Sequence, residues 1–127
     1  MTRRFLLATL GTAALAIGCA KEEPRLTASL HAKCKGCVVS YAGGVMQSKK
    51  DTLRGVVDPG TGDTLPEERS WKVEVKEGDN LFLRACRLDS ADTAFGMELR
   101  VDGDVRPVQA YADTARCMEI NRAVQKP

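Results

Sequence analysis

Four cysteines in this chain have types and spacing that could support redox, metal or disulfide chemistry. Cys34 and Cys37 stand in a Cys-Lys-Gly-Cys motif, while Cys86 and Cys117 lie farther along the chain. A redox-active Cys-x-x-Cys pair sits at a helix N-terminus, where the helix dipole lowers a thiol pKa. Here residues 38–41 (Val-Val-Ser-Tyr) follow the motif and are typical of a strand. The motif therefore favours structural disulfides over thiol catalysis.

Metal binding is the second kind of chemistry that the cysteines could support. A four-cysteine zinc site uses two close pairs, whereas the two later cysteines are 31 residues apart in sequence. A copper(I) site made of Cys34, Cys37, His31 and Met46 is chemically possible, because copper(I) accepts sulfur and imidazole ligands. We expect no cofactor. The alternative is a thiol-redox or soft-metal-binding protein that uses Cys34 and Cys37.

An even number of cysteines in a small exported domain predicts two disulfides. We favour Cys34–Cys37 across a turn and Cys86–Cys117 between two strands. The crossed pairing, in which Cys34 bonds Cys117 and Cys37 bonds Cys86, also fits a sandwich of two sheets. The sequence leaves these alternatives open.

No other group of residues predicts catalysis. His31 is the only histidine, and it lies on the polar face of a predicted strand, where we expect a solvated side chain. Ser40 lacks the pattern of a nucleophile elbow around it. Four aspartates near glycines are explained by turns rather than by calcium binding: Asp58, Asp63, Asp102 and Asp104. We therefore predict a protein that is not an enzyme.

The fifth cysteine, Cys19, ends an apolar segment. Arg3-Arg4 precedes the 13 residues from Phe5 to Ile17, which contain no charge. That length is too short to cross a bilayer, which takes about 20 residues, and fits the core of a signal peptide. The last residues, Ala16-Ile17-Gly18-Cys19, resemble a bacterial lipobox.

The lipobox resemblance implies cleavage before Cys19 and attachment of lipid, palmitate included, to this cysteine. Residues 1–18 are then a lipoprotein signal peptide, and residues 19–25 are a polar tether to the membrane. We expect an envelope location, with Ala20 favouring the periplasmic face of the outer membrane or the cell surface in a Gram-negative organism. Residues 2–7 also resemble a twin-arginine signal, so the export route stays open.

Charge is balanced in the residues that follow the predicted signal peptide. The chain has 19 basic and 17 acidic residues, and Arg3 and Arg4 are the only charged residues before Cys19. The remaining 109 residues therefore carry 17 charges of each sign. No basic stripe is left for nucleic acid, so we expect no nucleic-acid partner. The length is that of one domain.

Alternation of apolar and polar residues predicts seven or eight short antiparallel strands. Every second residue from Leu26 to Cys34 is apolar, and Trp71, Val73 and Val75 repeat this period. The other predicted strands lie at 37–41, 55–57, 81–88, 95–101, 105–112 and 115–120. Residues 44–70 are the least regular part, and a helix could fit only at 47–54. We predict an all-β, Ig-like β-sandwich over 26–121 and a frayed tail at 122–127.

Five short motifs follow one another through this predicted domain. They are Val39-Ser40-Tyr41, Leu65-Pro66, Gly78-Asp79, Val101-Asp102-Gly103 and the strand that contains Cys117. In this order they resemble the Ig-like domains of mycobacterial MmpS-type membrane proteins and of similar bacterial lipoproteins. The chain differs in having a lipobox in place of a membrane-spanning helix, and in its Cys34–Cys37 motif. The resemblance implies a non-enzymatic accessory or binding module beside an envelope transporter or assembly component.

Overall fold

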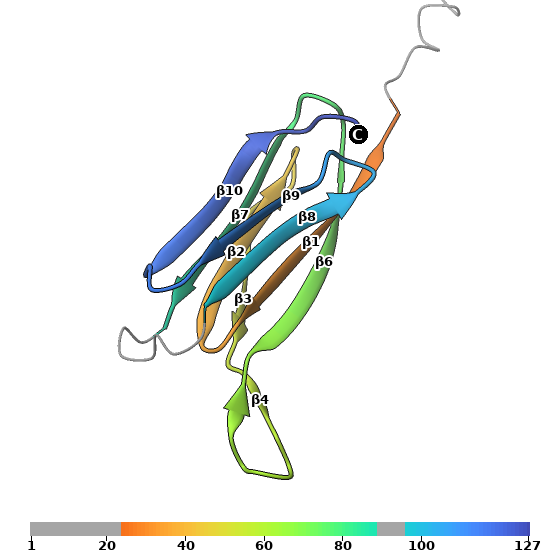
Figure 1. Cartoon of the computed structure of the whole chain (residues 1–127). Helices are drawn as coiled ribbons and strands as arrows, with labels where there is room; N and C mark the ends of the chain where they lie inside the picture. Colours follow the sequence, from red (N-terminus) through yellow and green to blue (C-terminus); the bar gives the residue numbers. More distant parts are fainter. Residues whose placement is uncertain (1–23, 89–95) are drawn as a thin grey trace, which may run out of the picture.

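The computed structural model describes residues 24–88 and 96–127, and these residues contain ten strands and no helix. The strands are β1 (Leu26–Cys34), β2 (Cys37–Gly43), β3 (Lys49–Leu53), β4 (Val56–Val57), β5 (Thr64–Leu65), β6 (Glu67–Val75), β7 (Asn80–Arg87), β8 (Met97–Gly103), β9 (Val108–Ala112) and β10 (Cys117–Ala123) (Figure 1).

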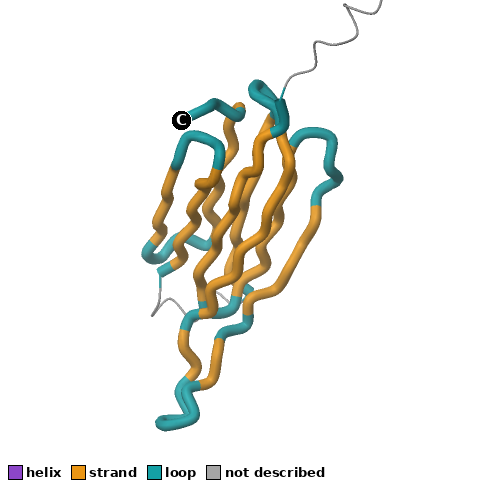
Figure 2. The backbone as a smooth tube through the Cα atoms, turned by 90° about the vertical axis from the view of Figure 1, so that its right-hand side faces the viewer, coloured by secondary structure: helices purple, strands orange, loops and turns teal. Residues whose placement is uncertain are grey.

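Eight of these strands form two facing four-stranded sheets. The first sheet has the order β6-β1-β8-β9 and the second β10-β7-β2-β3, and every pairing is antiparallel (Figures 1 and 2). The predicted all-β sandwich is confirmed. Strand β1 lies beside β6 and β2 beside β7, as strands B and E, and C and F, do in Ig domains. The second neighbour of β1 is β8, which comes from the C-terminal half of the chain.

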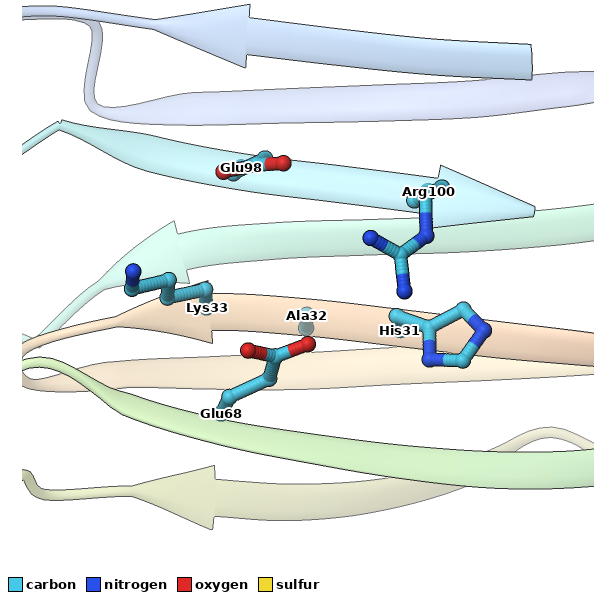
Figure 3. A pocket seen from close by; sticks show the side chains of 6 residues that line it. All are labelled: His31, Ala32, Lys33, Glu68, Glu98 and Arg100. Carbon is cyan, nitrogen blue, oxygen red and sulfur yellow. The ribbon is translucent and has the colours of Figure 1, made fainter.

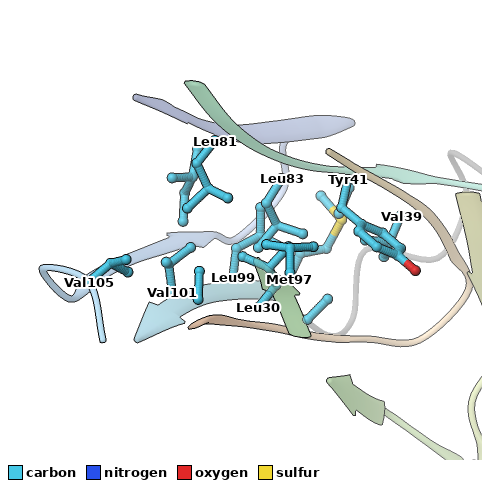
Figure 4. Close-up of a cluster of buried hydrophobic side chains, with 14 of the residues drawn as sticks. Leu30, Val39, Tyr41, Leu81, Leu83, Met97, Leu99, Val101 and Val105 are labelled. Carbon is cyan, nitrogen blue, oxygen red and sulfur yellow. The ribbon is translucent and has the colours of Figure 1, made fainter. Parts of the chain in front are cut away.

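The core lies between the sheets and follows from the alternation in the sequence. Ala28, Leu30 and Ala32 of β1 are 1% exposed or less, as the period of two predicts. Leu83 of β7 and Leu99 of β8 are fully buried among them (Figure 4). Each buried leucine side chain contributes about 1.5 to 3 kcal/mol to folding.

A strand occupies residues 49–53, so the one segment where the sequence allowed a helix, residues 47–54, forms none. β3 pairs with β2, from Cys37 opposite Leu53 to Tyr41 opposite Lys49. Leu53 is fully buried, and it is the last residue of β3. Backbone pairing with β2 decides this conformation, because the short polar segment has little local preference of its own.

The end of the chain is held by backbone hydrogen bonds beyond the last predicted strand. β10 runs to Ala123, and Val124 is 3% exposed. The N–H of Gly78 donates to the Val124 carbonyl at 2.9 Å, and the Val124 N–H donates to the Asp79 carbonyl at 2.7 Å. This segment is held by one apolar residue and by contacts with a distant turn. Neither produces a periodic pattern of apolar residues in the sequence.

One edge of the sandwich is closed by a polar network between β3 and β6. Arg69 of β6 donates to Asp51 Oδ1 of β3 at 2.6 Å and also to Glu67. The indole of Trp71 donates to the other oxygen of Asp51 at 3.3 Å. Trp71 in turn stacks on Tyr41 of the opposite sheet, with ring centroids 5.0 Å apart. Asp51 thus links the two sheets where their edge strands meet.

Replacing Asp51 by Asn should make the free energy of unfolding depend less steeply on pH in acid. The hydrogen bond from Arg69 lowers the pKa of Asp51 below its ordinary value of 3.8 in the folded state. A carboxyl with a lowered pKa stabilises the fold at neutral pH, and this contribution is lost as the pH falls past 3.8 towards the folded-state value. Urea unfolding from about pH 5 to about pH 2 should show a shallower decline for D51N than for the wild type.

The matched control is Asp63→Asn at the exposed tip of the β4–β5 hairpin, where the backbone N–H of Asp63 donates to Thr61. D63N should keep the wild-type acid dependence. Equal slopes for D51N and the wild type would show that the network carries no proton-linked stability.

Candidate functional site

The two disulfides lie in different surroundings. Cys34 and Cys37 are bonded across the turn between β1 and β2, and they are 1% and 0% exposed. Cys86 and Cys117 are bonded between β7 and β10, where they stand directly opposite each other. Their side chains point away from the core and are half-buried. The first disulfide therefore joins the two sheets inside the core, and the second lies on the outer face of one sheet.

The residues of the possible copper(I) site are not brought together. His31 and Cys34 point to opposite faces of β1, since they are three residues apart on a strand. Met46 follows the end of β2, whereas Cys37 begins that strand. Within residues 24–88 and 96–127, no three His, Cys, Asp or Glu side chains are grouped so that they could hold a metal ion.

Instead, His31 lies at the centre of a polar cluster on the outer face of the first sheet. Register places Ser70 of β6 directly opposite His31. On the other side, Asp102 of β8 stands opposite Ser29, two residues before His31. Diagonal neighbours of this kind are within reach of long side chains. Three adjacent strands therefore bring these side chains to one place, which we call the Ser70–His31–Asp102 cluster.

Both ring nitrogens of His31 have hydrogen-bond partners. Nδ1 lies 2.7 Å from Ser70 Oγ, and Nε2 lies 2.8 Å from Asp102 Oδ1. An ionised carboxylate can only accept, so the Nε2–H of His31 donates to Asp102. In the neutral imidazole Nδ1 then accepts the hydroxyl proton of Ser70. The His31 side chain is only 18% exposed, so it is not the solvated side chain expected from the sequence.

The second carboxylate oxygen of Asp102 also has a partner. Arg100, two residues earlier on β8, places Nε 3.3 Å from Asp102 Oδ2. This contact is an ion pair rather than a well-directed hydrogen bond, since Arg100 Nε has no hydrogen-bond partner within the described residues. The contact with Arg100 occupies Oδ2 of Asp102 and leaves Oδ1 for the hydrogen bond with His31.

A shallow pocket of about 230 Å³ opens beside the cluster. Its lining combines His31 with two cations and two carboxylates on neighbouring strands: Lys33, Arg100, Glu68 and Glu98, with Ala32 at its floor (Figure 3). Figure 3 shows the guanidinium of Arg100 extending from β8 towards His31. A larger hollow of about 440 Å³ lies beside Arg25 and Met46 and includes no member of the cluster. Both hollows are lined by charged residues, and the smaller one is the one that His31 lines.

Neither Ser70 nor the role of Asp102 is predicted by the sequence. Ser70 lies 39 residues from His31 and Asp102 lies 71 residues from it, so no motif contains them. Asp102 was assigned to a turn because Gly103 follows it. The sequence indicated only that His31 lies on the polar face of β1. Its neighbours on that face depend on the strand register.

A second exposed feature is the short hairpin made by β4 and β5. Val56, Val57 and Leu65 on its stem are 53%, 61% and 42% exposed. Its tip is closed by backbone hydrogen bonds between Asp58 and Asp63 and between Gly62 and Asp58. The hairpin projects from the sandwich at the end opposite to the start of β1 (Figures 1 and 2).

The hairpin is joined closely to the sandwich. Gly55 at its base has φ +110°, and an added Cβ there would lie 2.6 Å from the methyl group of Thr64 and 2.9 Å from the carbonyl oxygen of Leu65. The N–H of Gly55 donates to the Glu67 carboxylate at 3.2 Å. Only glycine fits this strained, crowded position, so the base of the hairpin is fixed.

Cys19, the predicted site of lipid attachment, lies outside the described residues. Among residues 24–88 and 96–127, no helix has the length and apolar character needed to cross a membrane. Comparisons with protein-family models, with curated proteins and with solved structures find no match to this chain.

Proposed function

We propose that this protein is a lipid-anchored accessory module that docks an envelope protein through its β4–β5 hairpin. The observation that carries the proposal is the exposed apolar stem of Val56, Val57 and Leu65 on an ordered projection. Apolar residues exposed together at such a site mark interaction surfaces. An ordered hairpin also loses little conformational freedom on binding, which favours affinity.

The position of the hairpin supports a protein partner rather than the anchoring membrane. A lipid on Cys19 would tether the domain through residues 20–25, which lead into β1. The hairpin lies at the far end from the start of β1 (Figure 1). Its tip carries Asp58 and Asp63, whose negative charges oppose contact with anionic lipid headgroups. We infer that the partner offers an apolar groove with basic residues at its rim.

The class of partner follows from the resemblance to MmpS-type domains and lipoproteins, which implies an envelope transporter or assembly component. Two acyl chains on Cys19 would hold the module there stably, at about 0.8 kcal/mol for each buried CH₂. The burial of Cys34 and Cys37 weighs against the thiol or metal alternative, because reagents and ions need access to the sulfur.

Site-specific photocrosslinking in native membranes tests the proposal. A photoreactive residue at Val57 should capture one membrane protein, and Val56→Asp should reduce that product at least tenfold, as expected for an apolar contact worth about 1.4 kcal/mol. Excess purified domain should compete for the same product. The matched control position is exposed Lys72 on β6, which should give no such product.

The anchor is tested in the same membranes with Cys19→Ser. This variant should lose palmitate labelling and leave the membrane fraction or remain unprocessed. Undiminished palmitate labelling would contradict the lipobox. Crosslinks that are equal from Val57 and Lys72, or that persist in the Val56→Asp background, would contradict hairpin docking.

A further inference from the structure

We propose that the Ser70–His31–Asp102 cluster is a nucleophile, its base and a positioning carboxylate, which together transfer acyl groups from short carboxylic esters. This activity goes beyond the proposed docking function and rests on different residues. It would be carried by the outer face of the first sheet, while the hairpin lies beyond the end of the sandwich.

The hydrogen bonds have the order that nucleophilic catalysis requires. A serine hydroxyl is a weak nucleophile until a neighbouring base accepts its proton, and that base needs a third group to orient it. Ser70 Oγ lies 2.7 Å from His31 Nδ1, within the range for proton transfer. Asp102 lies 2.8 Å from Nε2 and accepts its proton, which leaves the lone pair of Nδ1 directed at Ser70.

The surroundings suit a small ester. Ser70 is exposed on edge strand β6, so an acyl group can reach its oxygen without any rearrangement of the sheet. The adjoining pocket, which His31 lines but Ser70 does not, holds about 230 Å³, the size of a short acyl group rather than a long chain. Arg100 stands on the side of His31 opposite to Ser70, and its guanidinium extends towards His31 (Figure 3). A carbonyl group bound over the imidazole would meet its N–H groups as negative charge develops on the oxygen. The pocket carries both signs of charge, with Lys33 between Glu68 and Glu98, which favours an uncharged substrate.

The reaction balances without a cofactor. Ser70 Oγ forms a bond to the carbonyl carbon of the ester as its proton passes to His31 Nδ1, and the carbonyl electron pair moves to the oxygen. When this pair returns, the bond to the alcohol oxygen breaks, and the leaving group takes the proton from Nδ1. Water then attacks the Ser70 ester by the same route, which releases the carboxylic acid and restores the hydroxyl. Asp102 stabilises the imidazolium in both steps.

Two probes test this with the intact chain in detergent: a fluorophosphonate and p-nitrophenyl acetate. Peptide mass spectrometry should find the phosphonyl group on Ser70, and Ser70→Ala should abolish both labelling there and ester hydrolysis. His31→Gln should lower the rate of labelling by about 10² to 10⁴, the usual contribution of a general base. Ser40→Ala, at a half-buried serine on the outer face of the other sheet, is the matched control and should change neither rate.

Asp102 is a positioning residue and needs a readout of its own. Asp102→Asn should lower the labelling rate, while Asp102→Glu should restore part of it, which a general loss of structure would not do. Circular dichroism of each variant shows whether the sheet is intact, and Ser70→Ala is informative in any case because Ser70 is exposed. Absence of phosphonyl groups on Ser70, or hydrolysis that is unchanged in Ser70→Ala, would overturn the proposal and leave hairpin docking untouched.

Discussion

Replacing both Cys86 and Cys117 by serine should lower the free energy of unfolding by about 3 to 4 kcal/mol. Their disulfide closes a loop with a sequence separation of 31 residues. The bond restricts the unfolded chain over this whole loop, and the stabilisation grows with the logarithm of loop length. Serine fits the half-buried positions, so little packing is lost. Against a total stability of about 5 to 15 kcal/mol for a typical domain, this single bond is a large share.

Urea denaturation of the oxidised proteins measures the effect. The informative comparison is Cys34→Ala with Cys37→Ala, whose disulfide spans a sequence separation of only three residues. Loop entropy alone gives about 2 kcal/mol for that bond, and any further loss reports packing in the core. Mild reductant should open Cys86–Cys117 before Cys34–Cys37, because Cys86 and Cys117 are half-buried on the surface whereas Cys34 and Cys37 are fully buried. A loss below about 1 kcal/mol for the serine variant would contradict the loop argument.

Arg87→Met should cost about 2 to 4 kcal/mol of stability. Arg87 is 5% exposed and points into the end of the sandwich from β7. Its Nε donates to the Ala115 carbonyl at 2.9 Å, and its Nη2 donates to the Asp113 carbonyl at 2.8 Å. These bonds hold the turn between β9 and β10 against β7. Methionine keeps much of the volume but leaves the carbonyl oxygens of Asp113 and Ala115 without the donors that the buried arginine supplies, which is more costly than losing a bond at the surface.

Arg84→Met is the matched control, because Arg84 lies on the same strand with its side chain facing outward. Its effect should stay within about 0.5 kcal/mol, as is usual for surface positions. Urea unfolding of both variants separates the two roles, and hydrogen exchange should show faster exchange near Ala115 in R87M alone. Similar stabilities for R84M and R87M would mean that the hydrogen bonds from Arg87 make no net contribution to the free energy of unfolding.

Arg87 shows one limit of reasoning from the sequence. Residues 81–88 were predicted as a strand with apolar residues facing inward, and Leu81, Leu83 and Ala85 do so. The same parity turns Arg87 inward, although a charged residue there looks like the end of the strand. Its partners are carbonyl oxygens of a distant turn. Backbone acceptors are present at every residue, so the sequence carries no sign of which ones a buried arginine will meet.

β3 and the β4–β5 hairpin also have features that the sequence does not predict. Residues 49–53 are mostly polar and have little local preference, and they form a strand because the edge of β2 is available to pair with them. The sequence predicts a short strand at residues 55–57 and turns at Asp58 and Asp63. The exposure of Val56 and Val57, in contrast, follows from the hairpin extending beyond both sheets.

The period of the strands, and which of their residues face the core, follow from the sequence alone. The alternation from Leu26 to Cys34 predicted that Ala28, Leu30 and Ala32 would be buried, and it placed His31 on the opposite face. The reason is local: successive side chains on a strand point to opposite faces, whatever the strand pairs with. The apolar segment that ends at Cys19 is likewise a property of the sequence, and the lipid anchor stays a prediction from it.

Which strands are neighbours, and in which register they pair, depends on the tertiary structure. Pairing of β1 with β6 and β8 brings Ser70 and Asp102 to His31. A shift of one residue in either pairing would turn the partner side chain to the other face, and the cluster would not form. Register is set by the burial of all the strands together, which no single segment encodes. The chemistry of His31 therefore depends on the whole sandwich.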